Sequence, residues 1–308
     1  MAAEIQTVTA LPDLKPRDPH MHKGDAGRLF CVAGSVGMVG AAALCSRAAL
    51  RSGAGLVKVG MPWRLAAVVA GRDPNVMTVA LPETADGTIS AVAPTKILKA
   101  MEEHDVMLIG PGISTAPETV QAVKIMLPQV DARLVIDADA LNAIAKDPGE
   151  VLPKLNRDND LPILTPHPGE MRRLLGDEFK EADLGGDHEK RREIACWFAK
   201  QWNLCLVLKG HKTVVADPTR VYVNTTGNPG LAKAGSGDVL AGVIAALVGQ
   251  GYSSFDAAAL GTYLHGLAGD LIRDKIGEIG MLATDVIEAL PRAAYLHQQN
   301  SKESQRVG

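Results

Sequence analysis

Short, unbroken apolar runs recur along this chain and constrain its fold more than any other feature. They lie in "RLFCVAG" (28–34), "GLVKVGMP" (55–62), "DVMLIGPG" (105–112), "RLVIDADAL" (133–141) and "LCLVLKG" (204–210), with another at the start of segment 161–176. A continuous run, unlike an alternating one, indicates a strand that is buried on both faces, as in a parallel sheet covered by helices.

Segments of helical composition separate these runs at 40–53, 118–129 and 189–203. Alternating strands and helices are typical of βαβ units. The stretch 212–224 differs, because two short alternating strands flank a polar turn at Asp217, and it predicts an antiparallel hairpin. We therefore predict a three-layer α/β/α fold, with a mostly parallel central sheet flanked by helices.

The chain has 308 residues, of which 46% are hydrophobic, so it can bury a large core. No break in composition, long linker or internal repeat divides it, and this favours a single domain. We predict an N-terminal arm over residues 1–24, one catalytic domain over 25–300 and a polar tail over 301–308.

Charge and composition argue against several function classes. The net charge of -3 and the aromatic content of 4% do not indicate a nucleic-acid-binding surface. The first residues lack the pattern of a signal peptide and no apolar run is long enough to span a membrane, so we expect a cytoplasmic protein. No C-x-x-C pair occurs, and we interpret the four cysteines as core hydrophobes: Cys31, Cys45, Cys196 and Cys205.

Polar and glycine-rich motifs follow the predicted strands. They read "AGS" (33–35), "GPG" (110–112), "DAD" (137–139), "TPHPGE" (165–170) and "KGHKT" (209–213). Ligands of open parallel sheets bind beyond the carboxyl ends of the strands. We therefore expect these motifs to meet at one edge of the sheet.

The stretch "GNPGLAKAGSGDVLAG" (227–242) opens an apolar helix and holds one acidic residue, Asp238. The backbone N–H groups of Gly235, Ser236 and Gly237, with the positive end of the helix dipole, can form an anion site that suits a phosphate. A carboxylate beside such a site is explained if Asp238 accepts a proton from a hydroxyl during phosphoryl transfer.

A purely structural interpretation of the same stretch stays open, in which Asp238 caps the helix and the glycines serve packing. The chain has no Walker loop. The loop after the first strand, "GSVGMVG", is only a weak match to a dinucleotide-binding fingerprint.

Other polar residues also admit two interpretations. Lys209 is either a strand-end lysine that reaches solvent or part of the site. Asp137 and Asp139 can cap a helix, and we favour Asp137 as a neighbour of the active site. His265 is interpreted as a core histidine, and "EKRRE" (189–193) as a solvated helix face. Two histidines show no metal-ligand spacing and stay unassigned: His20 and His22.

Together these motifs resemble those of the ADP-dependent NAD(P)H-hydrate dehydratases, which are members of the ribokinase-like superfamily. The resemblance covers residues 20–295, and its most specific part is the combination of "HPGE", "KGxxT" and "GNPGLAxxGSGD". Further similar blocks are "HKGDAGRLFCVAGS" (22–35), "GAAALCSRAALRSGAGLVKV" (40–59), "IGPG" (109–112), "DADALN" (137–142), "YLHGLAGD" (263–270) and "GMLATDVIEALP" (280–291).

The resemblance implies a carbon–oxygen lyase that repairs hydrated NADH and NADPH. In that reaction ADP donates a phosphoryl group to the 6-hydroxyl of the S-epimer, phosphate leaves to restore the nicotinamide double bond, and AMP is released. Phosphorylation converts hydroxide into a good leaving group. The protein then has mainly to align two nucleotides and stabilise phosphoryl charge.

The resemblance also implies roles for individual residues. Asp238 is the base and contacts the hydrate, and the anion site is formed by Gly235, Ser236 and Gly237. The hydrate pocket is lined by Ala41, Gly112 and His167. The adenine nucleotide is bound by Lys209, Gly210, His211, Lys212, Thr213, Asn228 and Gly237. Met38 stands where some members carry an aromatic residue, which affects the details of the hydrate pocket.

Mg²⁺ is implied as an ion that bridges phosphate oxygens and is held by phosphate and water, so no protein residue is assigned as a metal ligand. The resemblance favours ADP over ATP as the phosphoryl donor. It also implies a homo-oligomer, such as a homotetramer, and a separate NAD(P)H-hydrate epimerase that handles the R-epimer.

Two other functions stay open on the sequence. One is a ribokinase-like kinase of a small molecule, of the hydroxymethylpyrimidine or thiazole type, which releases a phosphorylated product. The other is a non-catalytic nucleotide-binding protein. The motifs "TPHPGE" and "KGHKT" argue against the kinase, and Asp238 with its glycines argues against the non-catalytic protein.

Overall fold

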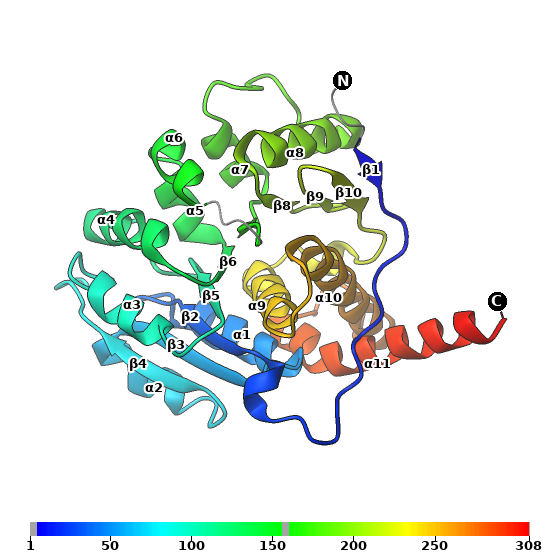
Figure 1. Cartoon of the computed structure of the whole chain (residues 1–308), viewed down its shortest axis with the longest axis horizontal. Helices are drawn as coiled ribbons and strands as arrows, with labels where there is room; N and C mark the ends of the chain where they lie inside the picture. The colour runs from blue at the N-terminus through cyan, green and yellow to red at the C-terminus, as the bar shows by residue number, and fades with distance from the viewer. Residues whose placement is uncertain (1–4, 156–159, 308) are drawn as a thin grey trace.

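The computed structural model describes residues 5–155 and 160–307, and side chains as far as Ser301. Its strands form a single sheet (Figure 1). From one edge to the other, the strands are β1 (Gln6–Thr7), β10 (Arg220–Val223), β9 (Val214–Ala216), β8 (Cys205–Leu208), β7 (Ile163–Leu164), β6 (Arg133–Ile136), β5 (Val106–Ile109), β2 (Arg28–Val32), β3 (Leu56–Pro62) and β4 (Met77–Leu81). Neighbours run parallel, except that β9 is antiparallel to both β8 and β10.

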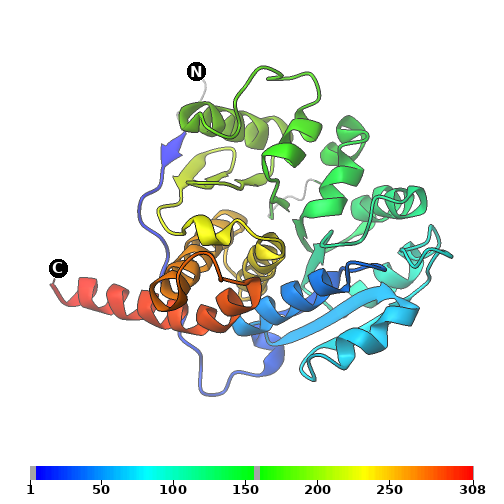
Figure 2. The same cartoon turned by 180° about the vertical axis from the view of Figure 1, so that it is seen from behind.

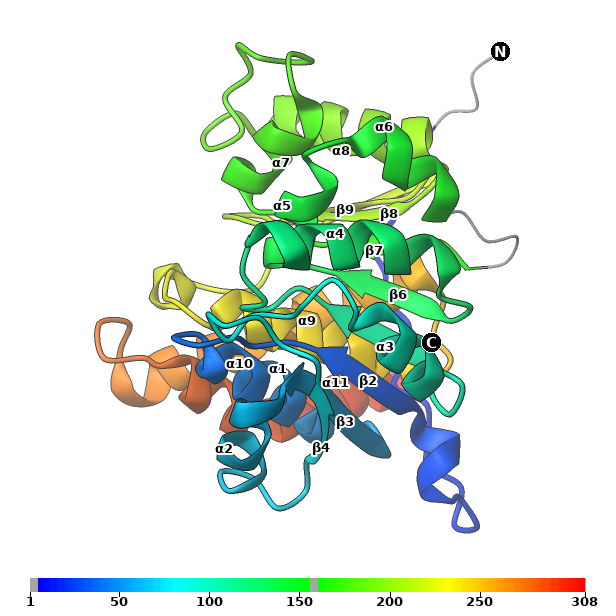
Figure 3. The ribbon, with the colours of Figure 1, turned by 90° about the vertical axis from the view of Figure 1, so that its left-hand side faces the viewer.

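Helices cover both faces of this sheet. One layer consists of α1 (Val39–Arg51), α2 (Ala66–Ala70), α9 (Ser236–Gly249), α10 (Ser254–Ile276) and α11 (Ala283–Val307). The other consists of α3 (Pro94–Met101), α4 (Pro117–Met126), α5 (Ala138–Ile144), α6 (Pro148–Val151), α7 (Pro168–Leu175) and α8 (His188–Trp202). Short 3-10 helices join some of these elements: η1 (Lys23–Ala26), η2 (Trp63–Leu65), η3 (Leu127–Gln129), η4 (Leu152–Leu155) and η5 (Pro229–Leu231). Figure 3 shows α7 and α8 on one side of β8 and β9, with α9 and α10 on the other.

The side chains of a central strand explain the two layers. In β2, Leu29 and Cys31 belong to the core beneath α1 and α9, whereas Phe30 and Val32 belong to the core on the opposite face. Because successive side chains of a strand point to opposite faces, an unbroken apolar run fills both cores at once. The predicted three-layer α/β/α fold with a mostly parallel sheet is confirmed.

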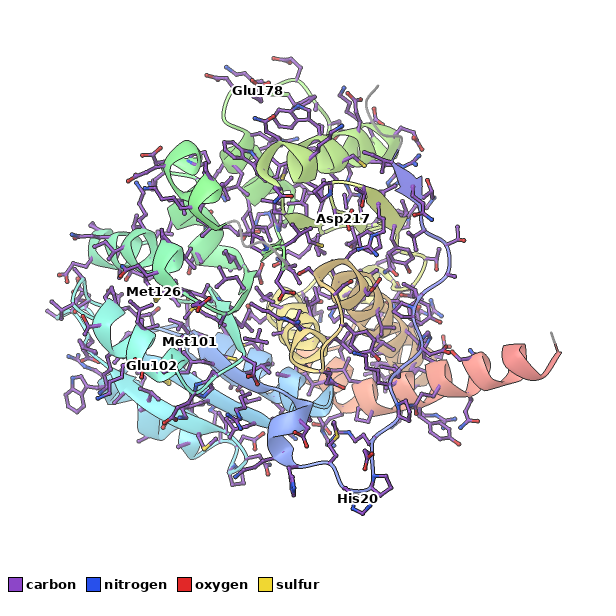
Figure 4. The ribbon with its side chains drawn as sticks, viewed as in Figure 1. His20, Met101, Glu102, Met126, Glu178 and Asp217 are labelled. Carbon is purple, nitrogen blue, oxygen red and sulfur yellow. The ribbon has the colours of Figure 1, made fainter. Side chains whose placement is uncertain are left out.

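The sheet contains an edge strand that the sequence did not predict. β4 was not predicted, because it is an edge strand whose residues are mostly half-buried, and Met77 is exposed. The segment 133–141 was predicted as a strand that breaks at its two aspartates, and β6 does end at Ile136, directly before Asp137, with α5 beginning at Ala138. The predicted hairpin is present as β9 and β10, with Asp217 at its turn (Figure 4).

The N-terminal segment follows the outside of the molecule. After β1 it runs past α10 and α11 before it reaches β2 (Figure 1). Lys15 N–H donates to the hydroxyl of Tyr252 at 2.7 Å, and the ring of His297 lies 2.9 Å from the carbonyl of Pro12. These contacts attach the segment to the loop before α10 and to α11.

At the other end of the chain, α11 extends away from the body of the molecule (Figure 2). The helix continues through the segment that was predicted as a polar tail, as far as Val307, and Gly308 lies outside the described residues. None of the described helices combines the length and the apolarity that crossing a membrane requires.

The order of the strands locates the expected ligand edge. From β2 the chain moves to β3 and β4 on one side, and then returns to β5 on the other side of β2. The loops that leave β2 and β5 therefore diverge at the carboxyl edge. In open α/β sheets, ligands bind at such a switch point.

α9 is the central helix of its layer. Its residues from Val239 to Val248 are all buried, and it packs tightly on α1. The contact is closest at Gly242, where a Cβ atom would lie 2.2 Å from the carbonyl oxygen of Cys45. A side chain at this position would have to separate the two helices.

We expect Gly242→Ala to lower the free energy of unfolding by about 1–3 kcal/mol, because the added methyl group meets backbone rather than a flexible side chain. Denaturant unfolding would measure the loss. The control is Gly149→Ala on exposed α6, where a Cβ atom would meet nothing within 4 Å. Equal midpoints for the two variants would contradict this account of the packing.

Candidate active site at the carboxyl edge of the sheet

A buried lysine stands at the centre of the carboxyl edge. Lys209 follows β8, and its Nζ lies 2.7 Å from Asp137 Oδ1 and 3.9 Å from Glu170 Oε2. Asp137 follows β6, and Glu170 lies in α7, which follows β7. Three adjacent strands therefore bring these groups together, as the sequence predicted for motifs at strand ends.

The lysine is not a freely solvated one, because only 17% of its side chain is exposed and its ammonium group pairs with two buried carboxylates. Burial opposes the charge of Lys209, but the attraction of Asp137 and Glu170 outweighs burial and raises the pKa of Lys209. Burial also raises the pKa of Glu170, while Lys209 opposes that shift. The interpretation of Lys209 as a solvent-reaching lysine is wrong.

Asp238 lies in the first turn of α9, beside this cluster. Burial and, after it, the negative charge of Asp137 raise the pKa of Asp238 to about 7. Lys209 acts in the opposite direction and keeps the shift from being larger. An ordinary carboxyl group is thereby converted into one that gains and loses its proton near neutral pH.

The predicted anion site lies at the start of α9. Gly235 precedes the helix with φ of +88°, a conformation that L side chains rarely adopt, and a Cβ atom there would lie 2.5 Å from Leu44 Cδ1. Ser236 N–H donates to the carbonyl of Lys233 at 3.3 Å, whereas the N–H of Gly237 lies in the first helical turn, where no helical carbonyl can accept it. At Gly237, a Cβ atom would lie 3.3 Å from Lys209 Nζ, so this turn faces the lysine closely.

A buried histidine supports the same turn. His265 of α10 has its Nε2 atom 3.3 Å from Ser236 Oγ. Burial lowers the pKa of His265 to about 4, so its imidazole is neutral at physiological pH. The sequence predicted a core histidine, and the structure connects this residue to the predicted anion site.

The predicted nucleotide loop, residues 209–213, leaves β8 next to Lys209. Thr213 Oγ1 donates to the carbonyl of Gly210 at 2.9 Å and closes the loop on itself. The guanidinium group of Arg191 in α8 donates to the carbonyls of Leu208 and Lys209 (3.0 and 3.1 Å). It also donates to the carbonyl of His211, at 2.6 Å.

The prediction of a solvated face at 189–193 is therefore wrong for Arg191, which is 1% exposed. A signal for its position was present in the sequence. Arg191 stands three and seven residues before Ile194 and Phe198, which are buried on the inner face of α8. Helical spacing places all three on one face.

His167, predicted to line the hydrate pocket, is the N-cap of α7. Its Nδ1 accepts from the N–H groups of Gly169 and Glu170, at 2.9 and 3.3 Å. In return, the Glu170 carboxylate accepts from His167 N–H at 2.8 Å. This capping box holds the imidazole next to the lysine cluster, while the side chain stays 51% exposed. Its role toward a hydrate stays a prediction.

Ala41 and Gly112, the other predicted pocket residues, meet where the loops after β2 and β5 diverge. A Cβ atom on Gly112 would lie 2.9 Å from Ala41 Cβ and equally close to Met38 Cβ. Ser35 Oγ donates to the carbonyl of Gly112 at 2.8 Å and joins the two loops. Ala41 stands one helical turn before Leu44, which contacts Gly235, so α1 connects this pair to the anion site.

Asn228 belongs to the loop before α9. Its side chain accepts from Gly230 N–H at 3.0 Å and donates to Asp270 of α10 at 3.0 Å.

In contrast, the two unassigned histidines of the arm are exposed, and His20 lies at the outer turn of the arm (Figure 4). Within the described residues, no group of three or more histidine, cysteine, aspartate or glutamate side chains is arranged to hold a metal ion.

The fold and this site define the class of the protein as ribokinase-like. The model of the NAD(P)H-hydrate dehydratase family matches residues 29–292, and the chain belongs to that family. The resemblance found in the sequence motifs is confirmed.

Individual relatives agree with this assignment. A bifunctional NAD(P)H-hydrate repair enzyme of Moorella thermoacetica is 47% identical over 90% of this chain and 51% of its own length. An ADP-dependent (S)-NAD(P)H-hydrate dehydratase of Neisseria meningitidis is 37% identical over 97% of this chain and 94% of its own length. The chain thus spans about half the length of the bifunctional relatives it matches.

A solved structure is similar as well. The ADP/ATP-dependent NAD(P)H-hydrate dehydratase of Bacillus subtilis, co-crystallized with ATP and Mg²⁺, superposes with a TM-score of 0.73. It is 30% identical, and the match covers 92% of this chain and 95% of that one.

We expect Asp238→Asn to stabilise the fold in a pH-dependent way. The folded-state pKa of about 7 lies above the ordinary value of 3.8, so wild-type stability falls as pH rises from about 4 to 7 and stays low above 7. The variant has no carboxyl group to ionise at this position, so its stability does not fall in this way. Its advantage in melting temperature should therefore grow between pH 4 and 7 and then level off.

The matched control for that series is Asp177→Asn, because the Asp177 side chain is fully exposed (100%). Its melting temperature should follow the wild type at every pH. An Asp238→Asn advantage that does not change with pH would contradict the raised pKa.

We expect Lys209→Met to destabilise the protein by about 3 kcal/mol, since it leaves the buried carboxylates of Asp137 and Glu170 without their cation. Chemical denaturation at pH 8 would measure the loss, with Lys200→Met on the exposed side of α8 as control. Adding Asp137→Asn to Lys209→Met should recover part of the loss, and no recovery would mean that the carboxylate is not the cause.

Proposed function

We propose that this chain dehydrates the S-epimer of hydrated NADH and NADPH, in a reaction coupled to the conversion of ADP to AMP and phosphate. The observation that carries the proposal is Asp238, a buried carboxyl group with a pKa of about 7 in the first turn of α9, beside the predicted anion site. Membership of the NAD(P)H-hydrate dehydratase family and the name of the Neisseria relative support it.

The first step transfers a phosphoryl group. Asp238 takes the proton of the 6-hydroxyl, the hydroxyl oxygen attacks the terminal phosphorus of ADP, and the bond to AMP breaks. A base with a pKa near the working pH is well matched to this proton transfer. The N–H groups at the start of α9 and the positive end of its dipole stabilise the charge on the transferred group.

The second step eliminates phosphate. The lone pair of the ring nitrogen forms a double bond to its neighbouring carbon as the bond from C6 to the phosphate oxygen breaks, and loss of a ring proton then restores the nicotinamide double bond. Lys209, held 2.7 Å from Asp137 and facing Gly237, supplies positive charge beside the leaving phosphate. The chain thereby acts as a carbon–oxygen lyase.

The nucleotide is proposed to lie over Lys209, Gly210, His211, Lys212, Thr213 and Asn228, next to Gly237. The hydrate is proposed to lie against Ala41, Gly112 and His167. When Mg²⁺ is bound, it neutralises charge on the phosphate oxygens. Lys209 pairs with Asp137 and Glu170, and Asp238 is assigned as the base, so we propose that Mg²⁺ would be held by phosphate and water rather than by these carboxylates.

Hydrated NADH, ADP and Mg²⁺ should regenerate absorbance at 340 nm with the wild-type chain. Asp238→Asn should lower turnover by about 10²–10⁴-fold while nucleotide binding persists, because the proton acceptor is lost and the anion site is kept. Asp177→Asn serves again as the unaffected control. Wild-type kcat/KM should rise with pH and level off above about 7, as Asp238 loses its proton.

The same assay distinguishes the alternatives. A small-molecule kinase would release a phosphorylated product with no gain of absorbance at 340 nm, and a non-catalytic protein would bind nucleotide without consuming it. Turnover that survives Asp238→Asn would contradict the mechanism even if NADH were formed. Replacing ADP by ATP in this assay tests which nucleotide donates the phosphoryl group.

We also propose partners for this reaction. An epimerase that converts the R-epimer would let the chain clear both epimers, and the bifunctional names of several relatives support such a pairing of activities. A homo-oligomer, with a homotetramer as the specific form, is proposed from the family resemblance and can be tested by light scattering.

A further inference from the structure

The nucleotide loop depends on a buried cation that belongs to a different element. Arg191 lies in the first turn of α8, is 1% exposed and is the largest fully buried side chain among the described residues. Burial lowers the pKa of Arg191. Within the described part of the chain, no carboxylate lies within ion-pair distance of its guanidinium group, so backbone carbonyls stabilise the charge.

The three carbonyls that Arg191 contacts belong to consecutive parts of one turn. Those of Leu208 and Lys209 lie at the end of β8, and that of His211 lies inside the loop. Between them, Gly210 has φ of +143°, and a Cβ atom there would lie 2.9 Å from a guanidinium nitrogen. The guanidinium group therefore packs directly against the loop backbone and fixes its path.

These hydrogen bonds also orient the opposite side of the loop. In a trans peptide, the N–H group points away from the carbonyl of the same plane. The carbonyl of Leu208 faces Arg191, and the N–H of Lys209 accordingly donates across to Pro166 at 2.9 Å. The carbonyl of His211 likewise faces Arg191, so the N–H of Lys212 points away from the guanidinium group.

A second side chain of α8 supports the same loop. His188, one turn before Arg191, packs edge-on against the ring of His211, with ring centroids 5.3 Å apart. The first turn of α8 therefore contacts the loop through a guanidinium group on its backbone and an imidazole on its side chain. The ion pair between Lys190 and Glu193 of α8 (2.8 Å) lies instead on the solvent side of the helix.

We propose that Arg191 is a positioning residue for nucleotide binding, which holds loop 209–213 in the conformation that presents Lys209 and the N–H of Lys212 to an adenine nucleotide. The inference rests on the proposed nucleotide-binding role of this loop. Arginine suits the task because its planar fork carries five donors, whereas lysine has a single flexible ammonium group.

The test compares wild type with Arg191→Met, Arg191→Lys and the control Arg192→Met, the next residue, whose guanidinium group donates to Thr7 at an exposed position. Titration calorimetry with ADP and Mg²⁺ measures the Kd. Arg191→Met should raise the Kd for ADP by about tenfold or more, the equivalent of one lost backbone contact. Arg191→Lys should fall between Arg191→Met and wild type, and Arg192→Met should match wild type.

Two further readouts separate positioning from general support of the fold. With ADP saturating, the KM for hydrated NADH should stay within about twofold of wild type in Arg191→Lys, since only the nucleotide loop is affected. Backbone hydrogen exchange at 210–213 should accelerate in the Arg191 variants, while exchange in β5 and β6 stays at its wild-type rate.

The outcomes distinguish this inference from the proposed function. If wild type binds neither ADP nor ATP, the proposed function fails, while loop exchange in the variants still decides whether Arg191 holds the loop. The inference would be overturned if the Arg191 variants kept the wild-type Kd for ADP and the wild-type rate of hydrogen exchange at 210–213. It would also be overturned by a general loss, in which the Kd for ADP and the KM for the hydrate rise together while the melting temperature falls, with Arg191→Lys no better than Arg191→Met. If Arg191→Met does not fold, Arg191→Lys gives the same decision.

Discussion

The buried pairing of Lys209 with Asp137 and Glu170 is the interaction on which the rest of the site depends. An ammonium group removed from water is costly unless anions surround it, and they come from Asp137 at the end of β6 and Glu170 in α7, the helix that follows β7. The pair therefore ties three neighbouring strands together at the edge where a ligand would bind. The capping box of His167 and Glu170 fixes one of these anions, and the hydrogen bond to Asp137 fixes the lysine.

The same cluster carries more negative than positive charge, and Asp238 shows the consequence. Burial first, and after it the negative charges of Asp137, Asp139 and Glu170, raise the pKa of Asp238 to about 7, while Lys209 acts in the opposite direction. An ionised Asp238 is unfavourable for the fold and useful for chemistry. Phosphate bound at the start of α9 would add to this repulsion, which explains why the backbone there offers N–H groups and a glycine turn rather than further side chains.

Prediction from the sequence succeeded where a residue's role is local. Continuous apolar runs identified the central strands, because burial on both faces requires every residue to be apolar. Glycines and acids after those runs identified the carboxyl edge. β4 escaped prediction because an edge strand needs only partial burial, and Arg191 escaped because a charged residue in a charged run is ordinarily solvated. Its helical spacing to Ile194 and Phe198 pointed inward, but spacing alone does not reveal a partner for the charge.

The sequence by itself determined the layered α/β/α class, the family motifs and the candidate residues of the site, since each of these is carried by residue type and spacing along the chain. Only the tertiary structure decided that Lys209 is paired rather than solvated, that Arg191 binds the loop backbone, and that Asp238 holds a proton near neutral pH. The reason is physical. Burial and the distances between charges from different strands set these properties, and neither quantity exists until the sheet brings distant segments together.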